Sequence, residues 1–134
     1  MGERVSYKAN GGTTEAYLAK PAGNGPGIVV IQEYWGLVPH IERIGDRYAE
    51  AGFVALAPDL YHGEQAKSPD EAGKLMMSMR IDQAARDLAA AIDYLAALPQ
   101  MTPKKVGTIG FCMGGALSLY AASLNPEVGA CMRN

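Results

Sequence analysis

One run of four β-branched residues constrains the fold of this chain more than any other feature. Ile28-Val29-Val30-Ile31 is apolar at every position, so both faces of the strand that it forms must be covered. Strands of this kind belong to parallel sheets that carry helices on both sides. Two further strand-like runs, residues 53–57 and 105–110, are separated by sequence with helical periodicity. This alternation predicts an α/β fold with a mostly parallel sheet and right-handed crossovers.

The remaining segments supply a hairpin, the helices and a last strand. Residues 5–18 predict an N-terminal β-hairpin around Asn10-Gly11-Gly12, because these residues adopt positive φ with little steric strain. Ser68-Pro69-Asp70-Glu71 is typical of a helix start with a capping serine. Apolar spacing predicts the other helices over residues 41–51, 81–95 and 116–124. Val128 to Met132 is expected to begin a fourth parallel strand, and no linker divides residues 1–134 into two domains.

Composition and charge exclude several classes of function. Twelve Lys and Arg against 14 Asp and Glu give a net charge of −2, without a basic cluster for nucleic acid or an anionic membrane. No apolar run approaches the roughly 20 residues that span a bilayer, and residues 1–4 lack the apolar stretch of a secretory signal. Cys112 and Cys131 match neither a disulfide scaffold nor a metal-binding spacing. We therefore expect a cytoplasmic protein with no metal or nucleotide cofactor.

The sharpest motif is a cysteine between two glycines at a strand-to-helix turn, Gly110-Phe111-Cys112-Met113-Gly114. This arrangement matches the nucleophile elbow G-x-S-x-G with cysteine in place of serine. The positive end of the following helix favours the thiolate of Cys112, and the backbone N–H of Met113 is free to face an oxyanion. The alternative is a buried structural cysteine in a tight turn. A dinucleotide-binding loop is excluded because no G-x-G-x-x-G follows any strand.

A second candidate segment, Gln32-Glu33-Tyr34-Trp35-Gly36, follows the first buried strand. Ligands of open α/β sheets bind at the carboxyl edge, where the Cys112 turn is also expected. A Glu33 carboxylate there is placed to hydrogen-bond the thiol or to act as its base, and the alternative is a solvated loop glutamate. Trp35 is expected to pack rather than to recognise a ligand.

Soft apolar residues and charges gather before the long helix. Leu75, Met76, Met77 and Met79 are expected to pack in the core, with a substrate-facing wall as the alternative. Arg80 is expected to be a solvated helix charge, although an acidic substrate would suit it.

Taken together, these motifs resemble those of the dienelactone hydrolases, the carboxymethylenebutenolidase-like α/β hydrolases. The segments that carry the resemblance are residues 31–36, 46–52, 57–61, 87–95 and 106–115. The resemblance implies the N-terminal part of an α/β-hydrolase fold and hydrolysis of an ester or lactone through a cysteine nucleophile, without a cofactor. By position, Cys112 matches the nucleophile and Glu33 the carboxylate that activates it. The backbone amides of Tyr34 and Met113 match the oxyanion hole.

The sequence departs from the family pattern after the nucleophile. In this fold the acid and the histidine follow the nucleophile along the chain, but the 22 residues after Cys112 contain no His and no Asp. The chain therefore resembles a truncated domain, and we expect weak turnover or acylation without efficient deacylation. His40 and His62 precede Cys112, and either would serve as the base only if a second chain supplied it. Pro69 and Gly73 stand where the family's type enzymes hold a carboxylated lactone with Arg and Tyr.

Two other functions stay open. A truncated sheet would leave its last strand, Val128 to Met132, with an unpaired edge, and such edges pair with another chain. This pattern favours a non-catalytic scaffold that self-associates. Both the enzyme and the scaffold predict a homodimer or higher homo-oligomer. Acyl transfer is the third reading, because a fold does not determine its reaction.

Overall fold

The computed structural model describes residues 2–9, 11–111, 117, 123–125 and 128–133. The segment from Cys112 to Gly115 and most of the helix expected over residues 116–124 lie outside these residues. The elements follow one another in the order β1 (Glu3–Ala9), β2 (Gly12–Ala19), β3 (Gly25–Ile31), α1 (Pro39–Glu50), β4 (Val54–Pro58), α2 (Pro69–Ser78), α3 (Ile81–Ala97), β5 (Met101–Gly110) and β6 (Val128–Arg133).

All the named strands belong to one six-stranded sheet with the order β1-β2-β4-β3-β5-β6. The central strand β3 runs parallel to β4 on one side and to β5 on the other, and β6 runs parallel to β5. The hairpin β1–β2 joins the sheet through β2, which lies antiparallel to β4. The predicted α/β fold, with a mostly parallel sheet and an N-terminal hairpin, is confirmed.

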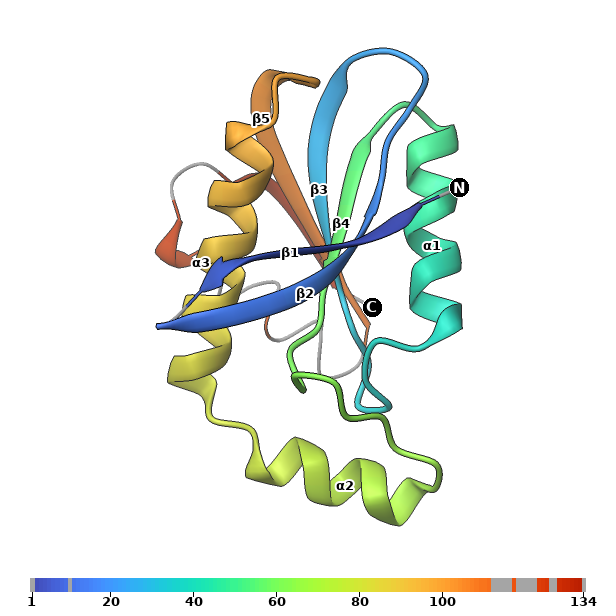
Figure 1. Ribbon diagram of the computed structural model, residues 1–134, viewed down its shortest axis with the longest axis vertical. Helices are drawn as coiled ribbons and strands as arrows, with labels where there is room; N and C mark the ends of the chain where they lie inside the picture. The colour runs from blue at the N-terminus through green and yellow to red at the C-terminus, as the bar shows by residue number, and fades with distance from the viewer. Residues whose placement is uncertain (1, 10, 112–116, 118–122, 126–127, 134) are drawn as a thin grey trace.

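Helices cover both faces of the sheet, with α1 on one face and α3 on the other (Figure 1). This is why the central strands are apolar along nearly their whole length. Val29 and Leu56 pack with the apolar face of α3, whereas Val30 and Ala55 pack with α1. The Ile28–Ile31 run therefore contributes to two separate cores.

The start of α2 is the one that the sequence predicts. Ser68 Oγ accepts a hydrogen bond from the backbone N–H of Glu71 at 3.2 Å, and the Glu71 carboxylate accepts one from Lys67 N–H at 3.0 Å. The helix itself lies beyond the carboxyl ends of the parallel strands, away from the sheet (Figure 1). Ala72 is the one buried residue of this helix.

The position of α2 corrects one expectation. The expectation that Met76 and Met77 pack in the core is wrong, because both side chains are exposed; Met77 keeps 85% of its surface accessible. A helix that projects past the sheet has few partners for its outer side chains. Met79 does pack against the core on the α3 side of the sheet, and it also lines, with Leu75, a cavity described below.

Two strands begin earlier than the apolar pattern indicates. β3 starts at Gly25 and β5 at Met101, because these two residues pair across the sheet and Met101 is fully buried. The backbone N–H of Gly25 also donates to the carbonyl of Gln100 at 3.1 Å. Pro103 follows Met101 and has no N–H to donate to a neighbouring strand, so the sequence alone does not indicate a strand at this point.

Candidate active site

The strand register brings the two candidate segments to the same edge of the sheet. Ile31 of β3 pairs with Gly110 of β5. Glu33 follows Ile31 by two residues, and Cys112 follows Gly110 by two residues. Cys112 and Met113 lie outside the described residues, which reach Phe111. The ends of the strands that carry the predicted nucleophile and carboxylate are therefore neighbours.

After β3 the chain makes a tight turn that carries Tyr34. The backbone N–H of Gly36 donates to the carbonyl of Glu33 at 3.1 Å. Gly36 has φ +103°, and a Cβ at this position would lie 2.9 Å from the carbonyl oxygen of Glu64. Both the conformation and the space at this position require glycine. The backbone of Tyr34 is thus held in a turn whose shape is strongly constrained.

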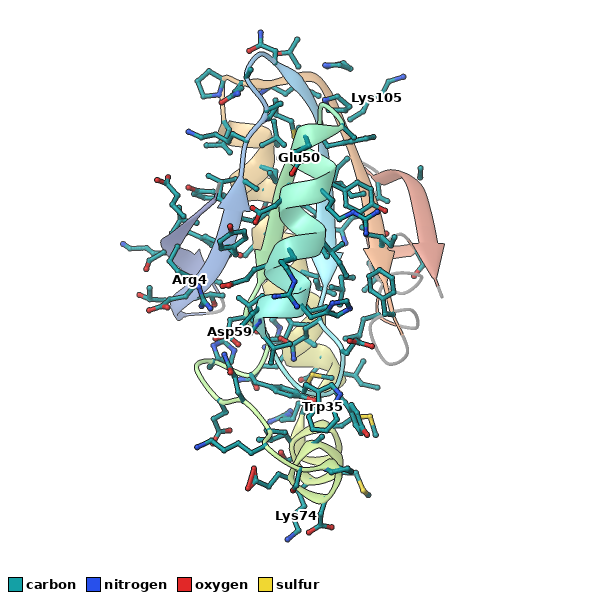
Figure 2. The ribbon with its side chains drawn as sticks, turned by 90° about the vertical axis from the view of Figure 1, so that its right-hand side faces the viewer. Arg4, Trp35, Glu50, Asp59, Lys74 and Lys105 are labelled. Carbon is teal, nitrogen blue, oxygen red and sulfur yellow. The ribbon has the colours of Figure 1, made fainter. Side chains whose placement is uncertain are left out.

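The side chains of this turn are half-buried. The rings of Tyr34 and Trp35 meet edge to face, with their centroids 5.2 Å apart. This contact agrees with the expectation that Trp35 packs. Figure 2 shows Trp35 and Asp59 toward the end of the molecule at which α2 lies, whereas Glu50 and Lys105 lie toward the opposite end.

A second loop, residues 59–68 between β4 and α2, lies against the turn. Three hydrogen bonds join them. Leu60 N–H donates to Gln32 Oε1 at 2.9 Å, Ala66 N–H donates to the Trp35 carbonyl at 3.0 Å, and Gln65 Nε2 donates to the Leu37 carbonyl at 2.9 Å. The β3–α1 turn is therefore attached to its neighbour both before and after Tyr34.

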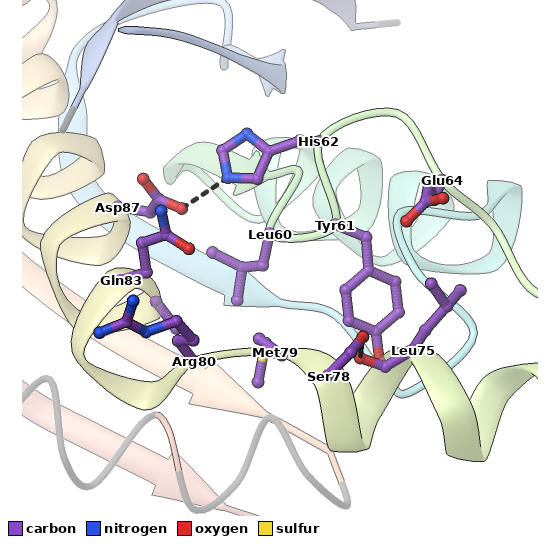
Figure 3. A pocket seen from close by; sticks show the side chains of 11 residues that line it. Leu60, Tyr61, His62, Glu64, Leu75, Ser78, Met79, Arg80, Gln83 and Asp87 are labelled. Carbon is purple, nitrogen blue, oxygen red and sulfur yellow. Dashed lines mark hydrogen bonds and ion pairs between the residues drawn. The ribbon is translucent and has the colours of Figure 1, made fainter. Parts of the chain in front are cut away.

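The two histidines lie in different surroundings. His62 Nε2 lies 2.9 Å from Asp87 Oδ2 of α3 (Figure 3). The His62 side chain is 47% exposed, whereas that of Asp87 is only 2% exposed. His40 is an exposed residue in the first turn of α1, beside a hollow of about 600 Å³ that Ile44, Tyr48 and Phe111 also line. Because α1 and α3 cover opposite faces, the structure does not bring these histidines together, and the role of either as a base for a second chain stays a prediction.

Asp87 is a buried acid that the sequence reading missed. Burial raises the pKa of the Asp87 carboxyl, and the attraction of His62 offsets part of that rise. The residue lies on the apolar face of α3 together with Ala84, Leu88 and Ala91. An acidic residue on such a face needs a polar partner, so the position of Asp87 in the apolar pattern was the sequence signal that could have identified it.

His62 and Asp87 also border a cavity of about 150 Å³ between the 59–68 loop and the junction of α2 with α3. Figure 3 shows Leu60, Tyr61 and Met79 on its apolar side, with Arg80 and Gln83 near Asp87. Arg80 is exposed and forms an ion pair with Asp82 at 3.1 Å. The expectation of a solvated helix charge at Arg80 agrees with this exposure.

Within the described part of the chain, no three His, Cys, Asp or Glu side chains gather closely enough to bind a metal ion. In the same part of the chain, no helix has the length and apolar character needed to cross a bilayer.

Comparison with known proteins gives one consistent result. The chain is 45% identical to Protein usf of Aquifex pyrophilus, covering 96% of this chain and 58% of that protein. It is 35% identical to carboxymethylenebutenolidase 1 of Cupriavidus pinatubonensis, covering 85% of this chain and 53% of that one. A crystal structure of a dienelactone hydrolase-like promiscuous phosphotriesterase from metagenomic libraries superimposes with a TM-score of 0.88 at 28% identity, covering 100% of this chain and 58% of the other.

The chain thus spans little more than half the length of these relatives. Its fold is that of the α/β hydrolases. The sequence pattern of the dienelactone hydrolase family matches residues 14–133, nearly the entire chain. This chain belongs to the dienelactone hydrolase family.

Proposed function

We propose that this chain carries the nucleophile half of an ester or lactone hydrolase, with Cys112 as the nucleophile. The observation that carries the proposal is the register that pairs Ile31 with Gly110 in a chain of this family. Glu33 and Tyr34 follow β3 in the sequence, and Cys112 follows the neighbouring strand β5, so the two segments leave the sheet at the same edge. Ligands of open α/β sheets bind at this edge.

Acylation uses three groups of the chain. Glu33 takes the proton of the Cys112 thiol, and the thiolate adds to the carbonyl carbon of the ester. The backbone N–H groups of Tyr34 and Met113 donate to the oxyanion that forms. When the oxyanion collapses, the C–O bond to the alcohol breaks, the alkoxide takes the proton from Glu33, and an acyl thioester remains on Cys112.

Deacylation needs a base that takes a proton from water while the water oxygen adds to the thioester. The thiolate of Cys112 leaves, and the carboxylic acid is released. In the α/β-hydrolase order the histidine and its acid follow the nucleophile, and the residues after Cys112 contain neither His nor Asp. In an assay of these 134 residues alone, acylation is expected to be faster than deacylation. If an alcohol replaced water, the same step would be acyl transfer.

The test is hydrolysis of p-nitrophenyl acetate with the early phase resolved, under reducing conditions. The parent chain is expected to release a burst of about one equivalent of p-nitrophenol followed by slow turnover. Cys112→Ala should abolish the burst, whereas Cys131→Ala should keep it. A burst that survives Cys112→Ala would refute Cys112 as the nucleophile.

The second candidate is a non-catalytic scaffold that self-associates through the edge of β6. The specific observation is that β6 is the last strand of the sheet, paired with β5 in the described residues. Open strand edges pair with other chains. A homodimer in sedimentation, without a Cys112-dependent burst, would favour the scaffold. In both cases we infer a cytoplasmic homo-oligomer, and a monomer at micromolar concentration would contradict that inference.

A further inference from the structure

Gln32 is a buried amide directly before the turn of the candidate active site. Its side chain is 0% exposed at the end of β3. Oε1 accepts the Leu60 N–H at 2.9 Å, and Nε2 has no hydrogen-bond partner among the described residues. Burying an amide with only part of its hydrogen bonds is unfavourable, so an apolar side chain would serve packing alone better. The position of Gln32 therefore calls for a role beyond filling the core.

The partner of Gln32 belongs to a turn that is itself fixed. The Asp59 carboxylate accepts hydrogen bonds from the N–H groups of Tyr61, at 3.2 Å, and Gly63, at 2.7 Å. The Asp59 N–H donates to the Glu15 carbonyl of β2 at 2.9 Å. His62, in the same turn, has φ +52° and reaches Asp87 of α3. The Leu60 N–H is thus presented from a segment tied to both the sheet and α3.

Tyr34 lies between two attachments to this segment. Gln32 is attached through its side chain two residues earlier, and Trp35 is attached through its carbonyl one residue later. The direction of the Tyr34 N–H depends on the backbone that these two bonds hold. Removing the Gln32 bond frees the side of the turn that leads out of β3.

We propose that Gln32 is a positioning residue that fixes the direction of the Tyr34 N–H toward the oxyanion. The inference rests on the proposed function, because Tyr34 matters only if acyl chemistry occurs at Cys112. Loss of an oxyanion donor lowers kcat by about 10²–10³-fold. A displaced donor retains part of its effect, so loss of the Gln32 bond should slow acylation by roughly 10–100-fold. KM should change much less.

The principal variant is Gln32→Met, which keeps the length of the side chain and removes its acceptor. Gln32→Glu retains an acceptor for the Leu60 N–H and should recover most of the acylation rate. The matched control is Gln65→Met, which removes the attachment at Leu37, beyond the turn. Gln65→Met should leave the acylation rate within about threefold of the parent. Equal losses in Gln32→Met and Gln65→Met would overturn the proposal.

Two readouts separate positioning from loss of structure. Alkylation of Cys112 by iodoacetamide, followed at that residue by mass spectrometry, forms no oxyanion. Gln32→Met should therefore leave the alkylation rate unchanged while p-nitrophenyl acetate acylation falls. A parallel fall in both rates would mean that Gln32 acts on the thiol or on the fold, and would refute the assigned role.

A parent chain without a Cys112-dependent burst would refute the proposed function, and Gln32 is then tested by amide hydrogen exchange. Gln32→Met should speed exchange of the Leu60 N–H and in residues 33–36 while leaving α3 protected. Unchanged exchange in both segments would overturn the positioning role independently of any activity. Faster exchange confined to them would support it.

Discussion

Gly36→Ala is the substitution through which the shape of the candidate active site is tested most simply. Gly36 has φ +103°, outside the range that residues with a Cβ adopt readily. A side chain held in such a conformation costs about 1–3 kcal/mol. The new Cβ would also lie 2.9 Å from the Glu64 carbonyl oxygen, closer than ordinary contact. Crowding of this kind adds roughly another 1–3 kcal/mol.

Gly52→Ala is the matched control because it shares the backbone conformation without the contact. Gly52 has φ +105°, and a Cβ there meets no atom within 4 Å. It follows α1, at the end of the sheet opposite the candidate site. The difference between the two variants isolates the close approach of Gly36 to Glu64.

Urea denaturation of both variants measures the free energy of unfolding, and the p-nitrophenyl acetate burst measures acylation. Gly36→Ala should lose more stability than Gly52→Ala by about 1–3 kcal/mol, the crowding cost alone. It should also slow acylation, because the turn that carries Tyr34 must move. Equal losses of stability in the two variants would show that the close approach to the Glu64 carbonyl costs nothing.

Three further predictions concern other parts of the fold. Burial raises the pKa of the Asp87 carboxyl in the folded state. The contribution of protonated Asp87 to stability is therefore complete below the usual carboxyl pKa of about 3.9, and it is lost as the pH rises through the higher pKa of the folded state. Asp87→Asn, which still accepts a hydrogen bond from His62, should therefore gain stability relative to the parent as the pH rises from about 4. Urea denaturation at several pH values measures this, and a difference in free energy of unfolding that stays constant with pH would contradict it. Ser68→Ala removes the N-cap hydrogen bond of α2 and should cost about 0.5–2 kcal/mol by urea denaturation. No loss of stability in this variant would mean that the cap does not stabilise the helix. In the same assay, Leu88→Ala should cost about 2–5 kcal/mol because Leu88 is fully buried, whereas exposed Met77→Ala should stay within about 0.5 kcal/mol of the parent. Similar losses of stability in the two variants would contradict this difference in burial.

Apolar periodicity was sufficient to predict the parallel core. The Ile28–Ile31 run has to be covered on both faces, and the structure covers it with α1 and α3. The start of α2 was also predictable, because a Ser68 cap and the Glu71 carboxylate are local in sequence. Features set by neighbours within a few residues were predicted well.

The positions that depend on distant partners were not predicted. Gln32 reaches Leu60, and Asp87 reaches His62, across 28 and 25 residues of sequence. No local pattern specifies such pairs, although an acid on the apolar face of α3 signalled that one was needed. The exposure of Met77 was missed for a related reason. Spacing shows that a helix has an apolar side but does not show whether the sheet lies beneath it.

The role of Cys112 is tested most directly by mass spectrometry of the parent chain quenched during reaction with p-nitrophenyl acetate. If Cys112 is the nucleophile, the chain carries one acetyl group, located on Cys112 and labile to hydroxylamine as a thioester, and Cys131 carries no comparable modification. The same peptide stays unmodified in Cys112→Ala. A parent chain that remains unmodified, or that carries acetyl on Cys131 and lysines with Cys112 free, would contradict the assignment of Cys112 as the nucleophile.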